Sequence, residues 1–270
     1  MAKAVVIGAG PAGLATAMLL AQRDFEVVVL DRDPAPPDVV DDAWTDWSRR
    51  SVSQFKQVHF LTPGGRALLQ EHLPAVLDAM LAAGAVRYNA IELLARRLPG
   101  GGDGVDFSPF ETITTCRRAV MEFGFLAAAR STPGVEVRHE SAVAGLTAGP
   151  SVTDRVPHIT GVTTEAGDTI AADVVIDAGG RRSPVGGLLA ALGTRAPEEH
   201  AEELGFVYQT RYYRGEALPE VRESVLSPAG SISLLTMPGD RGHWSVTLYH
   251  STSDKAMRRV RDPEVFDRVV

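Results

Sequence analysis

The sequence predicts an α/β fold with a parallel sheet, an inserted β meander and a separate antiparallel sheet. Three observations lead to this prediction. An apolar run at 4–7 enters a glycine-rich turn and then a helical segment. Short alternating segments between 142 and 178 interrupt the strand–helix alternation that a simple doubly wound sheet requires. Longer, aromatic strands occupy 205–214, 231–237 and 244–249.

The glycine-rich turn has the pattern G-x-G-x-x-G. Gly8 lets the chain turn out of the strand, Gly10 leaves room for backbone amides to approach a pyrophosphate, and Gly13 lets the following helix pack on the sheet. The helix start offers free N–H groups and the positive end of its dipole. We therefore expect a phosphate site formed by Gly8, Gly10, Pro11, Ala12 and Gly13.

A second apolar strand, 26–30, ends at Asp31, eighteen residues after Gly13. Near this spacing a carboxylate hydrogen-bonds the ribose of a bound dinucleotide. The alternative is a βαβ unit without a ligand, in which Asp31 is merely solvated. The combination of strand, turn, helix and acidic residue favours the dinucleotide.

Composition narrows the class of protein. The 270 residues, 44% hydrophobic and 23% charged, suit one large or two interlocked globular domains. A net charge of −7 argues against nucleic acid as a partner. The single cysteine, Cys116, excludes an intrachain disulfide and a multi-cysteine metal site. We see no apolar run of transmembrane length and no secretion signal, so we expect a cytoplasmic protein without membrane insertion. We also expect no bound metal.

Further helices are expected at 66–73, 75–83 and 118–130, and a glycine-rich loop or hairpin tip at 100–104. The alternating strands of the meander are expected at 142–146, 159–163, 169–171 and 174–178, with a hairpin turn at Gly167–Asp168. The aromatic strands predict an antiparallel sheet beside a substrate pocket. Pro263 opens a helix without a C-cap, so we expect the fold to be truncated at its C-terminus.

A second informative stretch is Asp177-Ala-Gly-Gly-Arg-Arg-Ser183, which follows a buried strand. In an open α/β sheet this edge binds ligands. The alternative is a Gly-Gly turn with solvated arginines. Its position after a strand, together with the N-terminal turn, favours a ligand site that includes Asp177 and Gly180.

With these stretches the sequence resembles the FAD-dependent monooxygenase superfamily, which includes aromatic hydroxylases, epoxidases, geranylgeranyl reductases and flavin halogenases. The resemblance implies a Rossmann-type FAD-binding domain. The N-terminal glycine motif, with Asp31 and Arg32, looks like its FAD-ADP site. Arg118, in Arg118-x-x-Met121–Glu122, looks like the arginine that reaches the FAD phosphates or ribityl region.

Two more stretches resemble this superfamily. The stretch from Asp177 to Gly180 is similar to its second flavin motif. Arg50, in Arg50-x-x-x-Gln54-x-x-x-x-His59, resembles a block in polyketide epoxidases. The resemblance implies that 1–80 and 112–195 form a discontinuous FAD-binding domain, while 81–111 and 196–270 supply incomplete parts of a substrate domain.

Departures from the family pattern indicate which branches of the superfamily the sequence resembles most. Gly179 stands where the hydroxylases have the aspartate of a D-G motif, which favours the reductase, halogenase and epoxidase branches. The tryptophan-rich halogenase element is not visible. A third Gly-Asp flavin motif belongs further along than this sequence extends, and we interpret the available pairs as turns, namely Gly102–Asp103, Gly167–Asp168 and Gly239–Asp240.

The resemblance implies a monooxygenase that transfers one atom of O2 to an aromatic or alkene small molecule through a flavin C4a-(hydro)peroxide. NAD(P)H, or a separate flavin reductase, would supply electrons. The alternatives are a flavin-dependent C=C reductase of the geranylgeranyl type, a non-catalytic dinucleotide-binding protein and an NAD(P) dehydrogenase. We assign no catalytic residue. For His59 and for His243, an acid–base role and a structural role are the two alternatives.

Overall fold

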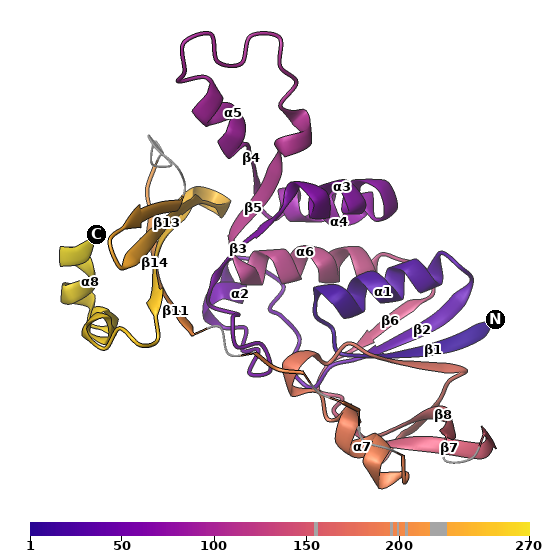
Figure 1. Ribbon diagram of the computed structural model, residues 1–270. Coiled ribbons are helices and arrows are strands. Elements are labelled where there is room, and N and C mark those ends of the chain that lie inside the picture. Colours follow the sequence, from indigo (N-terminus) through magenta and orange to yellow (C-terminus); the bar gives the residue numbers. More distant parts are fainter. Residues whose placement is uncertain (154–155, 195–196, 199, 203–204, 217–225) are drawn as a thin grey trace.

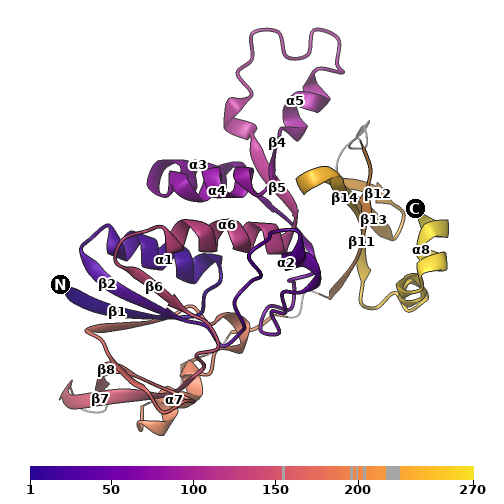
Figure 2. The ribbon, with the colours of Figure 1, turned by 180° about the vertical axis from the view of Figure 1, so that it is seen from behind.

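The computed structural model describes residues 1–153, 156–194, 197–198, 200–202, 205–216 and 226–270 (Figure 1). The chain builds a central parallel sheet with helices on one face and a small antiparallel sheet on the other. A second antiparallel sheet lies to one side (Figures 1 and 2). In the described part of the chain, no helix has the length and apolar character needed to cross a bilayer.

The parallel sheet has the order β10-β1-β2-β6. Its strands are β1 (Ala2–Ile7), β2 (Phe25–Leu30), β6 (Val135–Arg138) and β10 (Val174–Asp177). β10 pairs directly with β1, with Asp177 in register with Ile7. The carboxyl ends of two strands far apart in sequence therefore lie side by side, as the two motifs predict.

Alternate residues of β1 face two different layers, because side chains alternate along a strand. Val6 packs with α1 (Pro11–Ala21) and α6 (Arg118–Arg130), and Figure 1 shows both helices on the same face. Val5 and Ile7 pack on the other face, against the meander of β7 (Val143–Thr153), β8 (Val156–Thr164) and β9 (Thr169–Ala171). The predicted meander is confirmed for its first three strands, with Gly167 in the β8–β9 turn. Its fourth predicted strand, 174–178, instead joins the parallel sheet as β10.

A third sheet, β3-β5-β4, joins β3 (Val58–Leu61), β5 (Thr112–Arg117) and β4 (Val86–Tyr88). The neighbouring helices are α2 (Asp42–Thr45), α3 (Pro63–His72) and α4 (Pro74–Ala82). α3 begins three residues earlier than expected because Pro63 occupies its first turn, whereas α4 begins at Pro74, where a first turn is expected. Between β4 and β5, α5 (Ala90–Ala95), the glycine-rich loop and η1 (Ser108–Phe110) form a projecting arm (Figure 1).

The second antiparallel sheet has the order β11-β14-β13-β12. It contains β11 (Phe206–Arg214), β12 (Leu226–Ala229), β13 (Ile232–Pro238) and β14 (His243–Ser251), so the three predicted strands are confirmed and a fourth is added. η4 (Ala256–Arg261) and α8 (Pro263–Val269) follow it, and Phe266 packs on Leu248. Tyr213 stacks on Trp244 within this cluster, so these two aromatic residues belong to the core.

A short turn, η3 (Asp240–Gly242), anchors this sheet to β5. Asp240 is fully buried and accepts a hydrogen bond from Arg117 Nε at 2.8 Å. Thr114 Oγ1 donates to the carbonyl of Pro238 at 2.9 Å. The pair Gly239–Asp240 is a turn, as expected, but its aspartate also forms a buried ion pair that the sequence did not reveal.

We expect Asp240→Ala to lower the free energy of unfolding by about 3 kcal/mol, because it leaves the buried Arg117 without its main counter-charge. Urea denaturation measures this loss. Asp103→Ala, in the exposed loop of the arm, is the matched control and is expected to change stability by less than about 0.5 kcal/mol. Equal stabilities for the two variants would contradict the anchoring role.

Candidate functional site

A cavity of about 530 Å³ lies at the carboxyl ends of β1, β2 and β10. This volume is within the usual range of small-molecule sites. Both predicted motifs contribute to one cavity, so they face a shared space. Lining residues include Gly8, Gly10, Pro11, Ala12, Asp31, Arg32, Arg49, Gln54, Arg118, Ser141, Gly179, Gly180 and Arg181.

Two glycines allow β10 to approach the N-terminal turn. Gly8 has φ +104°, and a Cβ on it would lie 2.6 Å from the carbonyl oxygen of Ala178. A Cβ on Gly13 would lie 1.9 Å from the carbonyl oxygen of Gly8. Neither position has room for a side chain. The carboxyl ends of β1 and β10 can therefore lie this close only if both residues are glycine.

Gly10 has a different role. A Cβ added to it would meet no atom within 4 Å, and Gly10 lines the cavity. It is the N-cap of α1, and Pro11 occupies the first turn. The first-turn N–H groups of α1 have no acceptor within the helix, so they and the helix dipole favour an anion here.

The Asp31 carboxylate is only 3% exposed and is held by the chain itself. Its Oδ2 accepts from the Ala9 N–H and from Arg49 Nη2, each at 2.6 Å, and its Oδ1 accepts from the Asp33 N–H at 2.8 Å. About four lone-pair positions exist on a carboxylate. Asp31 therefore lines the cavity with most of its acceptor capacity already used.

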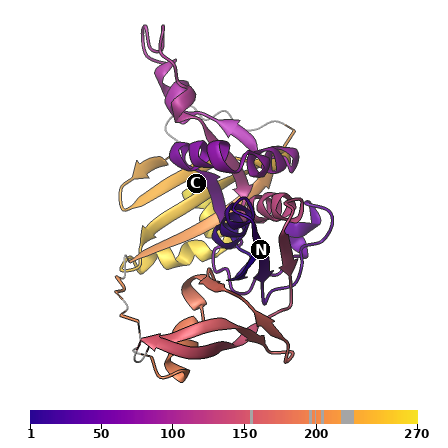
Figure 3. The same cartoon turned by 90° about the vertical axis from the view of Figure 1, so that its right-hand side faces the viewer.

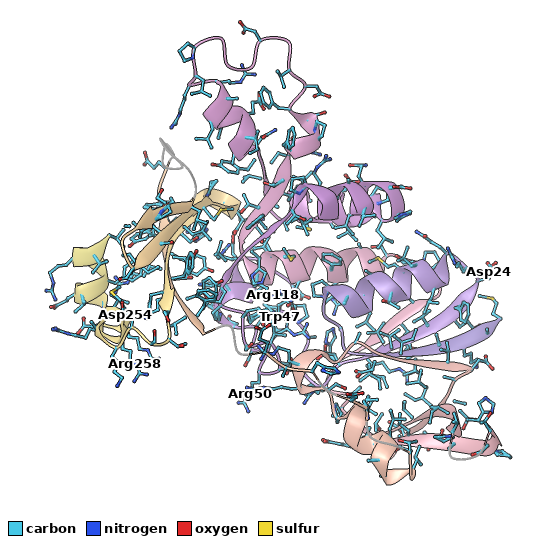
Figure 4. The ribbon with its side chains drawn as sticks, viewed as in Figure 1. Asp24, Trp47, Arg50, Arg118, Asp254 and Arg258 are labelled. Atoms are coloured by element: carbon cyan, nitrogen blue, oxygen red, sulfur yellow. The ribbon has the colours of Figure 1, made fainter. Side chains whose placement is uncertain are left out.

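Arg49 is not among the predicted site residues, yet it is the buried cation of this site. Its guanidinium pairs with Asp31, with Asp33 at 3.3 Å and with Glu122 at 2.9 Å. Arg50, the residue predicted instead, is exposed, is absent from the cavity lining and lies at the outer edge of the protein in Figure 4. Sequence spacing alone does not tell which of two adjacent arginines in an irregular loop turns inward.

Arg118 is the first residue of α6 and lines the cavity. Its Nε donates to Glu122 Oε1 at 2.6 Å, and its Nη1 lies 2.9 Å from His59 Nε2. A guanidinium has five N–H donors, so three remain after these two contacts. Glu122, fully buried, thus links Arg118 to Arg49; the i,i+4 spacing of Arg118 and Glu122 is the signal that points to this link.

His59 is neutral at pH 7. Burial lowers its pKa to about 4, and the nearby Arg118 cation acts in the same direction. Because arginine only donates, His59 Nε2 must be the acceptor, and Nδ1 carries the proton that is donated to the Gln57 carbonyl at 3.0 Å. The tautomer follows from its two partners.

The second motif is divided between cavity and surface. Gly179, Gly180 and Arg181 line the cavity. Asp177 does not line it: its exposed carboxylate accepts from the Gly179 N–H at 2.9 Å and caps its own turn. Arg32, at the end of β2, also lines the cavity and donates to the carbonyl of Arg182 at 3.2 Å.

We expect Arg49→Gln to lower the free energy of unfolding by about 3–5 kcal/mol, because it removes the shared cation from three buried carboxylates. The adjacent Arg50→Gln serves as the control and should change stability by less than about 0.5 kcal/mol. Urea unfolding of both variants without ligand makes the comparison. A small effect of Arg49→Gln would show that the cluster does not stabilise the fold.

The lowered pKa of His59 gives a pH-dependent prediction. Since the folded pKa of about 4 lies below the ordinary 6.5, the stability due to neutral His59 is complete above pH 6.5 and is lost as pH falls toward 4. Between pH 7 and 4.5, we expect the free energy of unfolding to fall by about 2 kcal/mol more in the wild type than in His59→Gln. Parallel pH profiles from urea unfolding would contradict this.

Comparison with known proteins supports a nucleotide-binding unit. A family model described as an NAD(P)-binding Rossmann-like domain matches residues 6–36. Among curated proteins, the chain is similar to Protein Rv3254 of Mycobacterium tuberculosis, with 26% identity over 284 residues. The match covers 98% of this chain and 56% of Rv3254, so the chain spans little more than half the length of that relative.

Solved structures agree on the fold. PqsL of Pseudomonas aeruginosa, described as a probable FAD-dependent monooxygenase, matches with a TM-score of 0.65 and 14% identity over 96% of this chain and 62% of PqsL. The p-nitrophenol 4-monooxygenase PnpA of Pseudomonas putida matches with a TM-score of 0.56 and 20% identity over 100% of this chain and 64% of PnpA. This chain shares its fold with PqsL and PnpA.

Proposed function

We propose that this chain forms the FAD-binding part of a flavin-dependent monooxygenase acting on a small aromatic or alkene substrate. The observation that carries the proposal is the single cavity in which the N-terminal glycine turn, the Gly179–Gly180 turn and Arg118 meet. The fold shared with PqsL and PnpA supports it. CtdE, solved in complex with FAD, has the same fold with a TM-score of 0.58 and 16% identity over 94% of this chain and 60% of CtdE.

The residues present fit an anionic dinucleotide. The space beside Gly10 is open where a side chain would otherwise stand, and α1 begins there. Arg118 offers its remaining N–H donors to the same cavity. Backbone N–H groups and a guanidinium are the usual ligands of a pyrophosphate.

Each part of the cavity suits one part of FAD. Gly10, Ala12 and Arg118 would hold the pyrophosphate, and Asp31 and Arg32 would lie on the adenosine side. FAD, when bound, supplies the electron transfer and oxygen chemistry. The chain's own residues bind and orient the cofactor.

The antiparallel sheet is the proposed substrate side. Tyr208 and Tyr249 lie on one face of β11 and β14, with ring centroids 5.6 Å apart, and Tyr208 remains 56% exposed. Aromatic faces of this kind suit a planar, apolar small molecule. Either NAD(P)H or a separate flavin reductase would supply the electrons.

The activity is tested by purifying the protein, measuring its flavin absorbance and supplying NADH or NADPH with and without a flavin reductase under ¹⁸O₂. Oxygen consumption with ¹⁸O in a product would support the monooxygenase. Turnover without oxygen would instead indicate a C=C reductase. A protein that binds no flavin would contradict the proposal and favour an NAD(P) dehydrogenase or a non-catalytic dinucleotide-binding protein.

We expect Gly10→Val to abolish FAD binding and to leave the fold intact, because its side chain would occupy the open space at the start of α1. Titration of the apoprotein with FAD, followed by flavin fluorescence, measures the loss. Gly186→Val is the matched control: its Cβ also meets no atom within 4 Å, and it lies outside the cavity lining. Equal FAD affinity in both variants would place the cofactor elsewhere.

A further inference from the structure

We propose that His59 is a positioning residue that fixes Arg118 for the cofactor pyrophosphate by acting as a neutral hydrogen-bond acceptor. The inference rests on the proposed FAD site. It gives a specific role to a histidine that the cavity lining does not include. His59 acts through Arg118 and not by touching the cofactor.

The backbone brings His59 and Arg118 together. His59 lies in β3, which pairs with β5, and Arg118 begins α6 directly after β5. The register shifts between His59 and Phe60 because β5 carries one extra residue, Thr115, and this bulge bends β5 three residues before Arg118. The imidazole is then held at both ends, with Nδ1 on the carbonyl of Gln57 and Nε2 on Arg118.

The segment that carries His59 is also tied to the second sheet. Gln57 Oε1 accepts from Thr210 Oγ1 at 2.8 Å, and Thr210 Oγ1 lies 2.8 Å from Thr247 Oγ1. Gln57 therefore contacts His59 through its backbone carbonyl and the antiparallel sheet through its side chain. The imidazole has little freedom to move away from Arg118.

Charge explains why the acceptor is a neutral imidazole. The cluster already contains three carboxylates, Asp31, Asp33 and Glu122, against two guanidinium groups, Arg49 and Arg118. This sum of three negative and two positive charges leaves a net charge of −1. Another carboxylate on Arg118 would raise the negative charge beside an anionic ligand to −2, whereas a neutral acceptor orients the guanidinium without opposing the pyrophosphate.

Three variants separate orientation from charge. The apoprotein is titrated with FAD and followed by flavin fluorescence. His59→Gln, which keeps a neutral acceptor, should bind FAD within about threefold of wild type, whereas His59→Phe should bind about tenfold more weakly because Arg118 loses one anchor. His59→Glu should also bind at least about tenfold more weakly, although it provides an acceptor. Wild-type affinity in His59→Glu would overturn the charge argument, and wild-type affinity in His59→Phe would overturn the positioning role.

A double-mutant cycle tests whether His59 acts through Arg118. In an Arg118→Gln background, His59→Phe should weaken FAD binding no further, because the side chain that it positions is gone. If His59→Phe weakens FAD binding by the same factor in the Arg118→Gln background as in the wild type, the inference is overturned. His72→Phe, which changes an exposed histidine of α3, is the matched control and should leave FAD affinity unchanged.

One measurement requires neither FAD nor a variant. In protein labelled with ¹⁵N-histidine, NMR should show His59 with Nδ1 protonated and Nε2 unprotonated at pH 7. The opposite tautomer would overturn the contact with Arg118, even if a variant failed to fold. If the wild type binds no FAD but shows the expected tautomer, the proposed function fails and the contact stands; if it binds FAD and His59→Phe binds it equally well, only this inference fails.

Discussion

The buried guanidinium of Arg49 holds the walls of the cavity together. Its partners come from the end of β2, from the loop that follows and from the middle of α6. Burying these charges has a desolvation cost that their attraction only partly offsets. What the cluster provides is a fixed geometry, since moving any one wall would leave a buried charge unpaired.

That geometry also sets the electrostatics of the cavity. α1 and α6 both begin at its edge, so two helix dipoles present their positive ends there. Glu122 orients Arg118 and partly neutralises it, while the neutral His59 provides orientation alone. Of the three carboxylates of the cluster, Asp33 and Glu122 do not line the cavity, and Asp31, which does, already accepts three hydrogen bonds.

Much of the architecture follows from the sequence because its signals are steric and local. Gly8 and Gly13 occupy positions where a Cβ would strike backbone atoms, and the strand that ends at Asp177 pairs beside β1 as expected. The choice of Arg49 over Arg50 depends on how an irregular loop packs, which no periodicity encodes. Arg118 follows a bulge in β5 opposite His59, and bulges leave no clear sequence signal.

Two adjacent arginines, Arg117 and Arg118, lie at the junction of β5 and α6. Figure 3 shows the C-terminal antiparallel sheet (gold and yellow) and the meander (pink and orange, at the bottom) as separate layers, and Figure 4 labels Arg118. Arg117 binds Asp240 in the turn of the antiparallel sheet, and Arg118 faces the cavity. Because one peptide unit separates their Cα atoms, a shift of the sheet against β5 would also displace the start of α6. The proposed substrate side and the proposed cofactor side are thus held in register by a strand-to-helix junction, and a side chain could not provide so rigid a link.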